Sequence, residues 1–275
     1  EVKKWKKKIK DKITENNLDK EVGDILWQVL EDSANYSFNK SHSISYASLA
    51  AITAYLKFKH PKEFFLALLR MTRFEPDPIA EISKIARELS KFDIKLLSPN
   101  LLRSEMDFCI EGDNIRFGLT SIKGISDKSI KKLENFKNKY SNKFEVFQGA
   151  GEAGIGVGIL SALIQAGALE GEFKHSRSYI VAEAQLWNLL TPREKVKCFE
   201  LAEEKDSQLM EIIKFLNKEL KDEKGKPFIK DSRVETIRRN FQPYKQIFQK
   251  NKQNQDFANW YYENALLGYT HGKFL

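Results

Sequence analysis

The sequence is poor in cysteine and has no spacing of side chains typical of a metal site. Cys109 and Cys198 are the only cysteines in 275 residues, and they lie far apart in the chain. The four histidines show neither metal-ligand spacing nor an obvious nucleophile partner. Neither a disulfide framework nor a zinc site is predicted, and a reducing, cytoplasmic compartment is expected.

Long apolar runs and catalytic motifs are also missing. No apolar stretch approaches the roughly 18 residues of a membrane span, and no signal peptide is visible, so no membrane partner is expected. There is no P-loop, and the carboxylates are scattered among lysines instead of clustered as two-metal nucleotidyl transfer requires. We therefore predict no catalytic residue and no bound cofactor. The chain begins without Met inside a helical pattern, which suggests a piece of a longer protein.

Positive charge, in contrast, is abundant. The chain has 46 Lys and Arg against 38 Asp and Glu, a net charge of +8 that suits an anionic polymer or an acidic partner. Residues 3–12 carry seven lysines around an apolar stripe that begins at Trp5. Such a run is either a solvated helix face or a contact with nucleic acid.

Helical periodicity dominates residues 1–92. The apolar residues from Val22 to Leu30 recur at i, i+3, i+4 and i+7, which predicts a well-buried helix. Four alanines between Ala47 and Ala54 predict that the following helix packs closely against a neighbour. Pro61 is expected to begin the next helix at its first position.

A polar turn precedes this alanine-rich helix and contains Asn39, Lys40, Ser41 and His42. The first turn of a helix has unpaired N–H groups and a partial positive charge, so it attracts anions. Lys40 adds a point charge, and His42 adds a hydrogen-bond donor. The segment is either a phosphate site or a simple helix cap at Ser41 or Ser43.

In residues 93–136 the apolar residues recur at a shorter period than in a helix. This pattern predicts a β-hairpin around Gly112, followed by a helix-hairpin-helix motif. Its hairpin is Lys123-Gly124-Ile125-Ser126, where Gly124 permits the tight turn and the following N–H groups face a DNA phosphate. Ser126 replaces the second glycine usual at this place. An ordinary helix cap at Ser126 or Asp127 is the alternative.

The glycine-rich run from Gly149 to Gly158 has two interpretations. Gly149 to Gly154 matches GxGxxG, follows the strand-like residues Phe144 to Phe147 and precedes an acid at Glu170, as in a nicotinamide enzyme. No further βαβ unit follows, however. We therefore favour a second helix-hairpin-helix that uses Gly154 and Gly156, with a second helix over Ile159 to Ala166 that ends at Gly167.

The rest of the chain is predicted to be helical. Thr191-Pro192-Arg193-Glu194 is a capping box that opens a long helix to about Leu220, and a charged linker covers 221–233. The last part is basic and aromatic, with side chains that either stack on bases or pack in the core; packing is favoured. These aromatic residues are Tyr244, Phe248, Phe257, Trp260, Tyr261 and Tyr262.

Several short motifs in their sequence order resemble one family, the bacterial C-family replicative polymerase represented by the alpha subunit of DNA polymerase III. They include Phe38-Asn39-Lys40-Ser41-His42, His60-Pro61, Leu97-Ser98-Pro99-Asn100, Ile122-Lys123-Gly124-Ile125, His175-Ser176-Arg177 and Leu266-Leu267-Gly268-Tyr269. The match covers residues 1–184 and the last dozen. Both a cellular and a phage source fit it.

The resemblance implies a mainly α fold in three regions. Residues 1–92 would be the end of the fingers, 93–170 a small β-hairpin with a tandem helix-hairpin-helix, and 171–275 a helical tail. Lys40 and His42, supported by Ser41 and Asn39, would contact the incoming dNTP. The hairpins at Lys123–Ser126 and Gly154–Gly156 would hold the primer-template duplex through its phosphates.

The resemblance also implies that the palm, with its catalytic aspartates and Mg²⁺, precedes this chain, which should be inactive alone. Residues 190–260 have no clear counterpart in the family. Gln253 to Phe257 keeps the outer Gln and Phe of a clamp-binding motif, which makes a sliding clamp a candidate partner, but Asp256 stands where an aliphatic residue belongs. The rival is a non-catalytic helix-hairpin-helix module of a repair or recombination factor.

Overall fold

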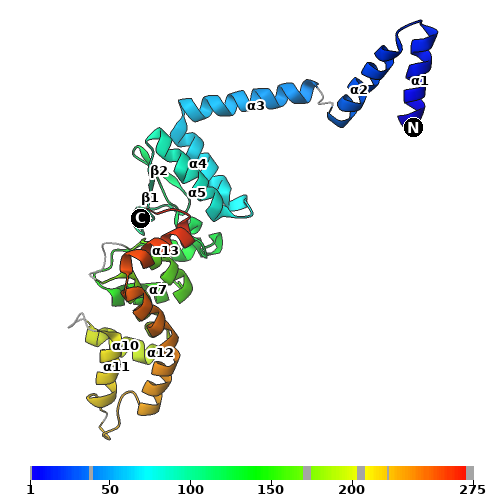
Figure 1. The fold of residues 1–275 in the computed structure, drawn as a ribbon. Coiled ribbons are helices and arrows are strands. Elements are labelled where there is room, and N and C mark those ends of the chain that lie inside the picture. Colours follow the sequence, from blue (N-terminus) through cyan, green and yellow to red (C-terminus); the bar gives the residue numbers. More distant parts are fainter. Residues whose placement is uncertain (1, 37–39, 170–174, 203–207, 222, 271–275) are drawn as a thin grey trace. The chain divides into compact units, whose positions relative to one another are not determined.

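The computed structural model describes the backbone of residues 2–36, 40–169, 175–202, 208–221 and 223–270; the side chains of 2–3, 34–36 and 40–41 are not described. The predicted mainly α fold is confirmed, with one small sheet among the described residues. The chain divides into two compact units, residues 1–59 and residues 60–275, whose relative placement is undetermined (Figure 1).

The first unit contains α1 (Val2–Glu15), α2 (Lys20–Tyr36) and α3 (Lys40–Lys59). The helices α1 and α2 pack against each other through the buried side chain of Ile13. An ion pair of 2.8 Å joins Lys10 Nζ on α1 to Asp24 Oδ1 on α2. The side-chain hydrogen bond from Lys10, together with its charge, lowers the pKa of Asp24. The contacts of Ile13 and this ion pair therefore hold α1 against α2.

Two burial predictions for this unit are wrong for the described residues. The apolar side chains of the predicted α2 stripe, Val22, Ile25, Leu26, Val29 and Leu30, are exposed, with Ile25 63% accessible. The alanines of α3 are exposed as well, as are Ile44, Leu49 and Phe58. The predicted helices are correct. The spacing of apolar residues shows which face of a helix is apolar, but it does not show whether another surface covers that face.

The second unit begins with α4 (Pro61–Met71) and α5 (Pro78–Leu89), each followed by a 3₁₀ turn, η1 (Thr72–Phe74) and η2 (Ser90–Phe92). Pro61 starts α4 as predicted, since its fixed φ and missing N–H suit the first helical position. The side chain of Asp77 caps α5 by accepting a hydrogen bond of 3.2 Å from the Ala80 N–H. Phe65 and Leu69 of α4 are fully buried.

A three-stranded sheet follows, formed by β1 (Leu96–Leu97), β2 (Cys109–Glu111) and β3 (Asn114–Arg116) in the order β1-β3-β2. The strands β2 and β3 form the predicted antiparallel hairpin, which turns at Gly112, while β1 pairs with β3 in parallel. Arg116 donates to the two oxygens of Glu111 and to the carbonyl oxygen of Ser98. This network ties the hairpin to the segment after β1.

The helix-hairpin-helix region comprises η3 (Leu119–Ser121), η4 (Asp127–Ser129), α6 (Ile130–Phe136), α7 (Lys143–Glu152) and α8 (Val157–Gln165). The strand-like interpretation of Phe144 to Phe147 is wrong, because these residues lie in α7. Asn142 caps that helix through hydrogen bonds from the N–H groups of Phe144 and Glu145. Burial of Phe144, Val146 and Phe147 on its inner side outweighs their β propensity.

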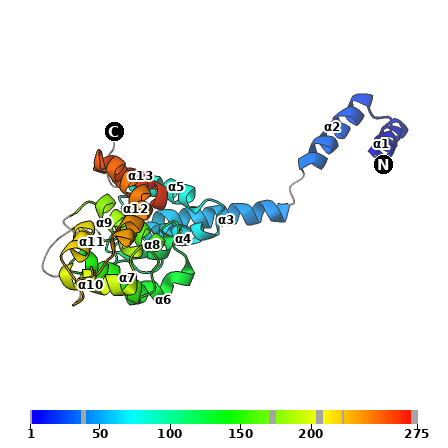
Figure 2. The same cartoon turned by 90° about the horizontal axis from the view of Figure 1, so that it is seen from below.

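The tail comprises α9 (Arg177–Asn188), α10 (Pro192–Ala202), α11 (Leu209–Lys218), α12 (Asp231–Lys252) and α13 (Gln255–Leu267). Helix α9 packs on α8 and on α12 (Figure 2). The capping box is confirmed: the Thr191 N–H donates to Glu194 Oε2 at 2.7 Å, and the Glu194 N–H donates to Thr191 Oγ1 at 3.3 Å.

The single long helix predicted up to Leu220 is wrong, because α10 and α11 are separate helices. The second begins after the extended backbone of Gln208, where the N–H of Leu209 donates to Glu183 Oε2 on α9 at 2.9 Å. A tertiary hydrogen bond therefore sets the start of α11, and no local sequence signal marks that position.

A buried ion pair lies at the centre of this region. Lys143 Nζ on α7 is 3.2 Å from Glu183 Oε2 on α9, and their side chains are 2% and 7% exposed. Lys143 also donates to Tyr179 Oη at 3.1 Å. Burial raises the pKa of Glu183, although the charge of Lys143 acts in the opposite direction. The pair joins α7 to α9, and Glu183 also holds α11.

Candidate nucleic-acid interface

The first hairpin is a tight turn with its glycine exposed. The Ile125 N–H donates to the Ile122 carbonyl oxygen at 3.0 Å, and Gly124 between them has φ +90°. This φ is strained for any residue with a Cβ, although a Cβ here would meet no atom within 4 Å. Ile122 and Ile125 are buried, so the turn is anchored by its two ends. Ile125, a predicted DNA-contact residue, can reach a ligand only through its backbone.

Ser126 shows why a single glycine is sufficient at this hairpin. Its φ of −123° and ψ of 166° are extended, a conformation that any residue adopts. The backbone N–H of Lys123 donates to the Leu266 carbonyl oxygen at 3.0 Å, which fixes the hairpin to α13, while the Lys123 side chain is exposed. The helix before the turn is reduced to the 3₁₀ turn η3.

The second hairpin also turns at a positive-φ glycine, but it lies between two regular helices and is closed by a hydrogen bond that spans more residues. The Ile155 N–H donates to the Ala150 carbonyl oxygen at 2.7 Å, and Gly154 has φ +71°. Ile155 is buried, while Gly154 and Gly156 are exposed, and Gly156 is the N-cap of α8. The predicted second helix is confirmed: α8 covers Val157–Gln165 and ends before Gly167. Because α7 replaces the strand that a dinucleotide fold requires, the nicotinamide interpretation is wrong; Glu170 lies outside the described residues.

The two hairpins obtain their positive charge differently. Lys123 and Lys128 lie exposed beside Gly124 within the first motif. The second motif has no Lys or Arg between 151 and 158, but the side chain of Lys132 from α6 approaches Gly154, with its Cε 3.7 Å from the position a Cβ would occupy. A cation from the first motif thus lies at the second hairpin. This role of Lys132 was not predicted, since only the fold brings α6 to Gly154.

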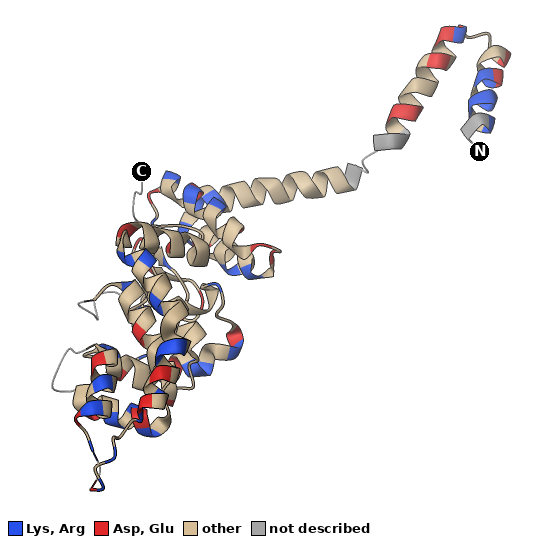
Figure 3. Cartoon of the chain, turned by 60° about the horizontal axis from the view of Figure 1, so that its bottom comes forward, with Lys and Arg blue, Asp and Glu red and all other residues tan. Residues whose placement is uncertain are grey.

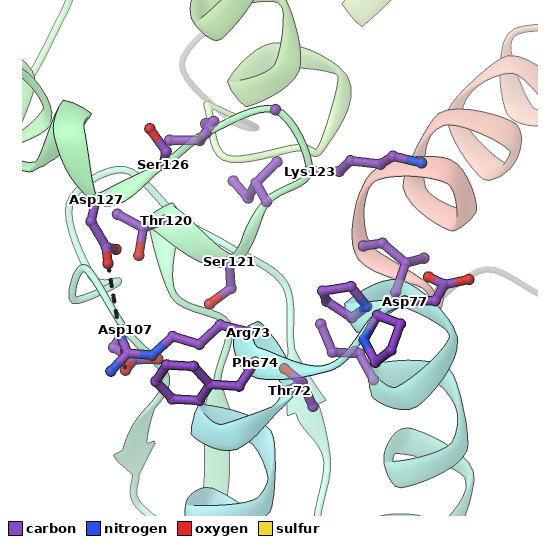
Figure 4. A pocket seen from close by; sticks show the side chains of 17 residues that line it. Thr72, Arg73, Phe74, Asp77, Asp107, Thr120, Ser121, Lys123, Ser126 and Asp127 are labelled. Carbon is purple, nitrogen blue, oxygen red and sulfur yellow. Dashed lines mark ion pairs between the residues drawn. The ribbon is translucent and has the colours of Figure 1, made fainter.

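A cleft of about 850 Å³ lies between the first hairpin and the turn from Thr72 to Ile79. Figure 4 shows Arg73 in this cleft, directed toward two carboxylates. Arg73 Nη1 is 3.9 Å from both Asp107 Oδ2 and Asp127 Oδ2. Asp127 stands in the first turn after the hairpin, where its charge would repel a phosphate. Arg73 therefore reduces an unfavourable charge at the hairpin, a role the sequence pattern did not indicate.

The predicted nucleotide-binding residues belong to the first unit. Asn39 lies outside the described residues, and Lys40 and Ser41 begin α3 with undescribed side chains. His42, in the first turn of α3, is exposed and packs edge-on against Tyr46, with ring centroids 4.4 Å apart. Most of α3 carries no charge, as its tan ribbon in Figure 3 shows. Between Lys40 and Lys57 the sequence of α3 contains no Lys, Arg, Asp or Glu.

The clamp-like motif spans the turn between α12 and α13. Gln253 ends α12, and Asn254 caps α13 by accepting a hydrogen bond of 3.0 Å from the Phe257 N–H. In the parts of the chain that the structure describes, no group of three His, Cys, Asp or Glu side chains is arranged to hold a metal ion. None of the helices described is long and apolar enough to cross a membrane.

A family model described as a helix-hairpin-helix motif matches residues 93–179, which include both hairpins. The chain is 37% identical over 125 residues to the DNA polymerase III subunit alpha of Deinococcus radiodurans, covering 46% of this chain and 9% of that protein. The corresponding subunit of Thermus aquaticus is 33% identical over 159 residues, 57% of this chain and 13% of that protein. The resemblance to the alpha subunit is confirmed.

The alpha subunit of Aquifex aeolicus is similarly related, with 33% identity over 153 residues. These alpha-subunit alignments are longer than the helix-hairpin-helix segment, so the similarity extends beyond the DNA-binding motif itself. This favours the polymerase over a repair factor that shares only the hairpins. The chain spans 9–13% of the length of these alpha subunits.

Proposed function

We propose that this chain is part of a replicative DNA-directed DNA polymerase alpha subunit and that its second unit binds the primer-template duplex. The observation that carries the proposal is the pair of hairpins, each exposing a positive-φ glycine that is followed by a buried isoleucine and a helix start. Backbone N–H groups there bind phosphate without reading base sequence. The positive side chains nearby are Lys123, Lys128 and Lys132.

Duplex binding by the chain tests this proposal. Fluorescence anisotropy with a labelled duplex should show binding that weakens steeply with salt, since several phosphates are neutralised. The Gly124→Val/Gly154→Val variant should lose at least about tenfold in affinity. Gly225→Val is the matched control, because Gly225 also has a positive φ of 71° and open space but lies in neither hairpin. Salt-independent binding, or equal affinity of the double variant and the control, would refute the proposal.

We further propose that the first turn of α3 contributes to the site for the incoming dNTP, with Lys40 and His42 as contacts and Ser41 and Asn39 in support. The positive N-terminal end of a helix and a nearby Lys stabilise a triphosphate. These residues would bind and align the nucleotide; the catalytic aspartates and their Mg²⁺ would come from a palm outside this chain. The chain by itself would therefore not extend a primer, even with Mg²⁺ and dNTP.

Steady-state kinetics of a polymerase that contains this chain and its palm test the nucleotide site. Lys40→Ala should raise the KM for dNTP about tenfold, as expected for the loss of one charged contact. Lys57→Ala, at the other end of α3, is the control. An unchanged KM in the Lys40 variant would exclude the nucleotide contact.

A further inference from the structure

The segment from 236 to 255, which forms most of α12 and the turn to α13, contains five cations and no acidic residue. Glu235 precedes it and Asp256 follows it. All five cations are exposed or half-buried at the surface of α12: Arg238, Arg239, Lys245, Lys250 and Lys252. Arg238, Lys245 and Lys252 are spaced by seven residues, close to two helical turns, so they lie along one side of the helix. No acidic residue of this segment lies between these three cations.

Aromatic rings occupy the start of the next helix. Phe257 and Tyr261 are four residues apart on α13 and are 45% and 54% exposed. Phe257 stacks on Trp260 with ring centroids 5.8 Å apart and an interplanar angle of 26°, and it is 6.5 Å from the ring of Tyr261. Exposing rings of this size to water is unfavourable. Their accessible faces form a ready surface for stacking.

The aromatic residues of α12 behave differently. Tyr244 and Phe248 pack against the hydrophobic core. Phe248 contacts the ring of Tyr179 on α9 at 5.8 Å in an edge-on arrangement. The prediction that the aromatic residues pack is thus correct for these two, while Phe257 and Tyr261 keep large exposed areas. The structure separates one aromatic set into core residues and surface residues.

The turn holds the cations and the exposed rings close together. Asn251 Nδ2 donates to Tyr262 Oη at 3.4 Å, and Asn254 caps α13. The last turn of α12, with Lys250 and Lys252, is thereby fixed next to the first turn of α13, with Phe257. Figure 1 shows α12 and α13 as consecutive helices of the second unit.

We propose that single-stranded DNA binds around the end of α12 and the start of α13, where Lys245 and Lys252 lie along one side of α12, Lys250 lies on another side, and Phe257 and Tyr261 expose their rings. Cations attract its phosphates, and aromatic faces stack on bases of any sequence. A duplex offers the phosphates but keeps its bases stacked inside, so it would leave the rings unused. The proposal is independent of the duplex site, because it uses none of the hairpin residues.

Anisotropy of the whole chain with a labelled oligo(dT) of about 16 nucleotides tests this site. The Phe257→Ala/Tyr261→Ala variant should bind oligo(dT) at least about tenfold more weakly. Phe215→Ala is the matched control: Phe215 lies on α11 and is also 45% exposed. Tyr261→Phe, which keeps the ring, should retain the affinity, and circular dichroism would verify that each variant is folded.

The charges require their own variants. Lys245→Gln/Lys250→Gln/Lys252→Gln should lower the slope of log affinity against log salt by about two for single strands. Lys214→Gln/Lys218→Gln, two exposed lysines of α11, should leave that slope nearly unchanged. Equal oligo(dT) affinity in the ring variant and its control would overturn the proposal. The proposal would also be overturned if the ring variant kept its oligo(dT) affinity but lost binding to a sliding clamp, because this surface would then be a protein-docking site.

The two DNA proposals fail separately. Gly124→Val/Gly154→Val should weaken the duplex while leaving oligo(dT) affinity within about twofold of wild type. An equal loss of duplex affinity and oligo(dT) affinity would show that single-stranded DNA binds at the hairpins, and it would overturn the proposed single-strand site on α12 and α13. If this variant loses neither affinity, duplex binding by the hairpins is refuted, while the proposed single-strand site stands.

Discussion

The two hairpins share a glycine turn but differ in their closing hydrogen bonds and in their surroundings. Each has an exposed glycine at positive φ followed by a buried isoleucine, Ile125 or Ile155. The first carries its own lysines, stands between 3₁₀ turns and has the exposed Arg73 with its carboxylates alongside. The second has no cation of its own and stands between α7 and α8, with α7 held by the buried pair of Lys143 and Glu183.

This difference separates two requirements of phosphate binding. A turn must hold its N–H groups in place, and some cation must attract the anion. The second hairpin has the more regular helix start, whereas the first has more charge. Lys132 connects them, since it belongs to the helix of the first motif and lies against the glycine of the second. We therefore expect the two hairpins to respond differently to the same kinds of substitution.

The largest expected effect concerns the framework of the second hairpin. Lys143→Met should lower the free energy of unfolding by about 3–5 kcal/mol, because it leaves the Glu183 carboxylate buried without its counter-ion. In this variant the folded-state pKa of Glu183 lies further above its unfolded value, so stability should fall as pH rises. Urea denaturation at about pH 5 and about pH 8 measures both effects.

Lys143→Met/Glu183→Gln provides the control for this effect. The second substitution exchanges the carboxylate for an amide, which keeps an acceptor for the Leu209 N–H but carries no charge. The double variant should therefore be more stable than the single one at about pH 8. Equal stability of the two would mean that lost packing, and not an unpaired charge, causes the loss.

A smaller effect is expected from the glycines taken singly. Gly154→Val should weaken duplex binding about tenfold, and Gly124→Val less, because Lys123 and Lys128 still attract phosphate at the first hairpin. Both substitutions place Val at positive φ, +90° at Gly124 and +71° at Gly154, so each strains its own turn, and the difference in duplex affinity between them is the quantity compared. Anisotropy at one fixed salt concentration measures it, and a reversed order would contradict the comparison.

A smaller effect is expected when individual lysines are removed, and the salt dependence of duplex binding measures it. Lys132→Ala should lower the salt slope by about one if this cation contacts a phosphate at the second hairpin. Lys123→Ala/Lys128→Ala should lower it by up to about two. Lys139→Ala, an exposed lysine outside both hairpins, is the control and should leave the slope unchanged.

The smallest effect on folding is expected at the first hairpin. Arg73 is 54% exposed and its ion pairs are long, so Arg73→Gln should change the free energy of unfolding by less than about 1 kcal/mol. It should nevertheless weaken duplex binding at low salt, since Asp107 and Asp127 lose a neighbouring cation. Denaturation and anisotropy on one sample separate the two effects. A large loss of stability would make Arg73 a structural residue.

Local signals in the sequence were sufficient for many element boundaries. Pro61 begins α4, the capping box at Thr191 and Glu194 begins α10, and Gly167 follows α8, because each acts through its own backbone or its nearest neighbours. The glycines of both hairpins were predicted on the same basis. The nucleotide-binding role of Lys40 and His42 stays a prediction, and so does the division of the chain into three functional regions.

Sequence alone thus determined the helical periods, the caps and the tight turns, since these depend on interactions within a few residues. Tertiary structure decided what depends on distant partners. It made α7 a helix by burying Phe144 and Phe147, and it began α11 where Glu183 accepts the Leu209 N–H. It also exposed Phe257 while packing Phe248. Burial and long-range hydrogen bonds are properties of the assembled fold, and no local pattern of residues contains them.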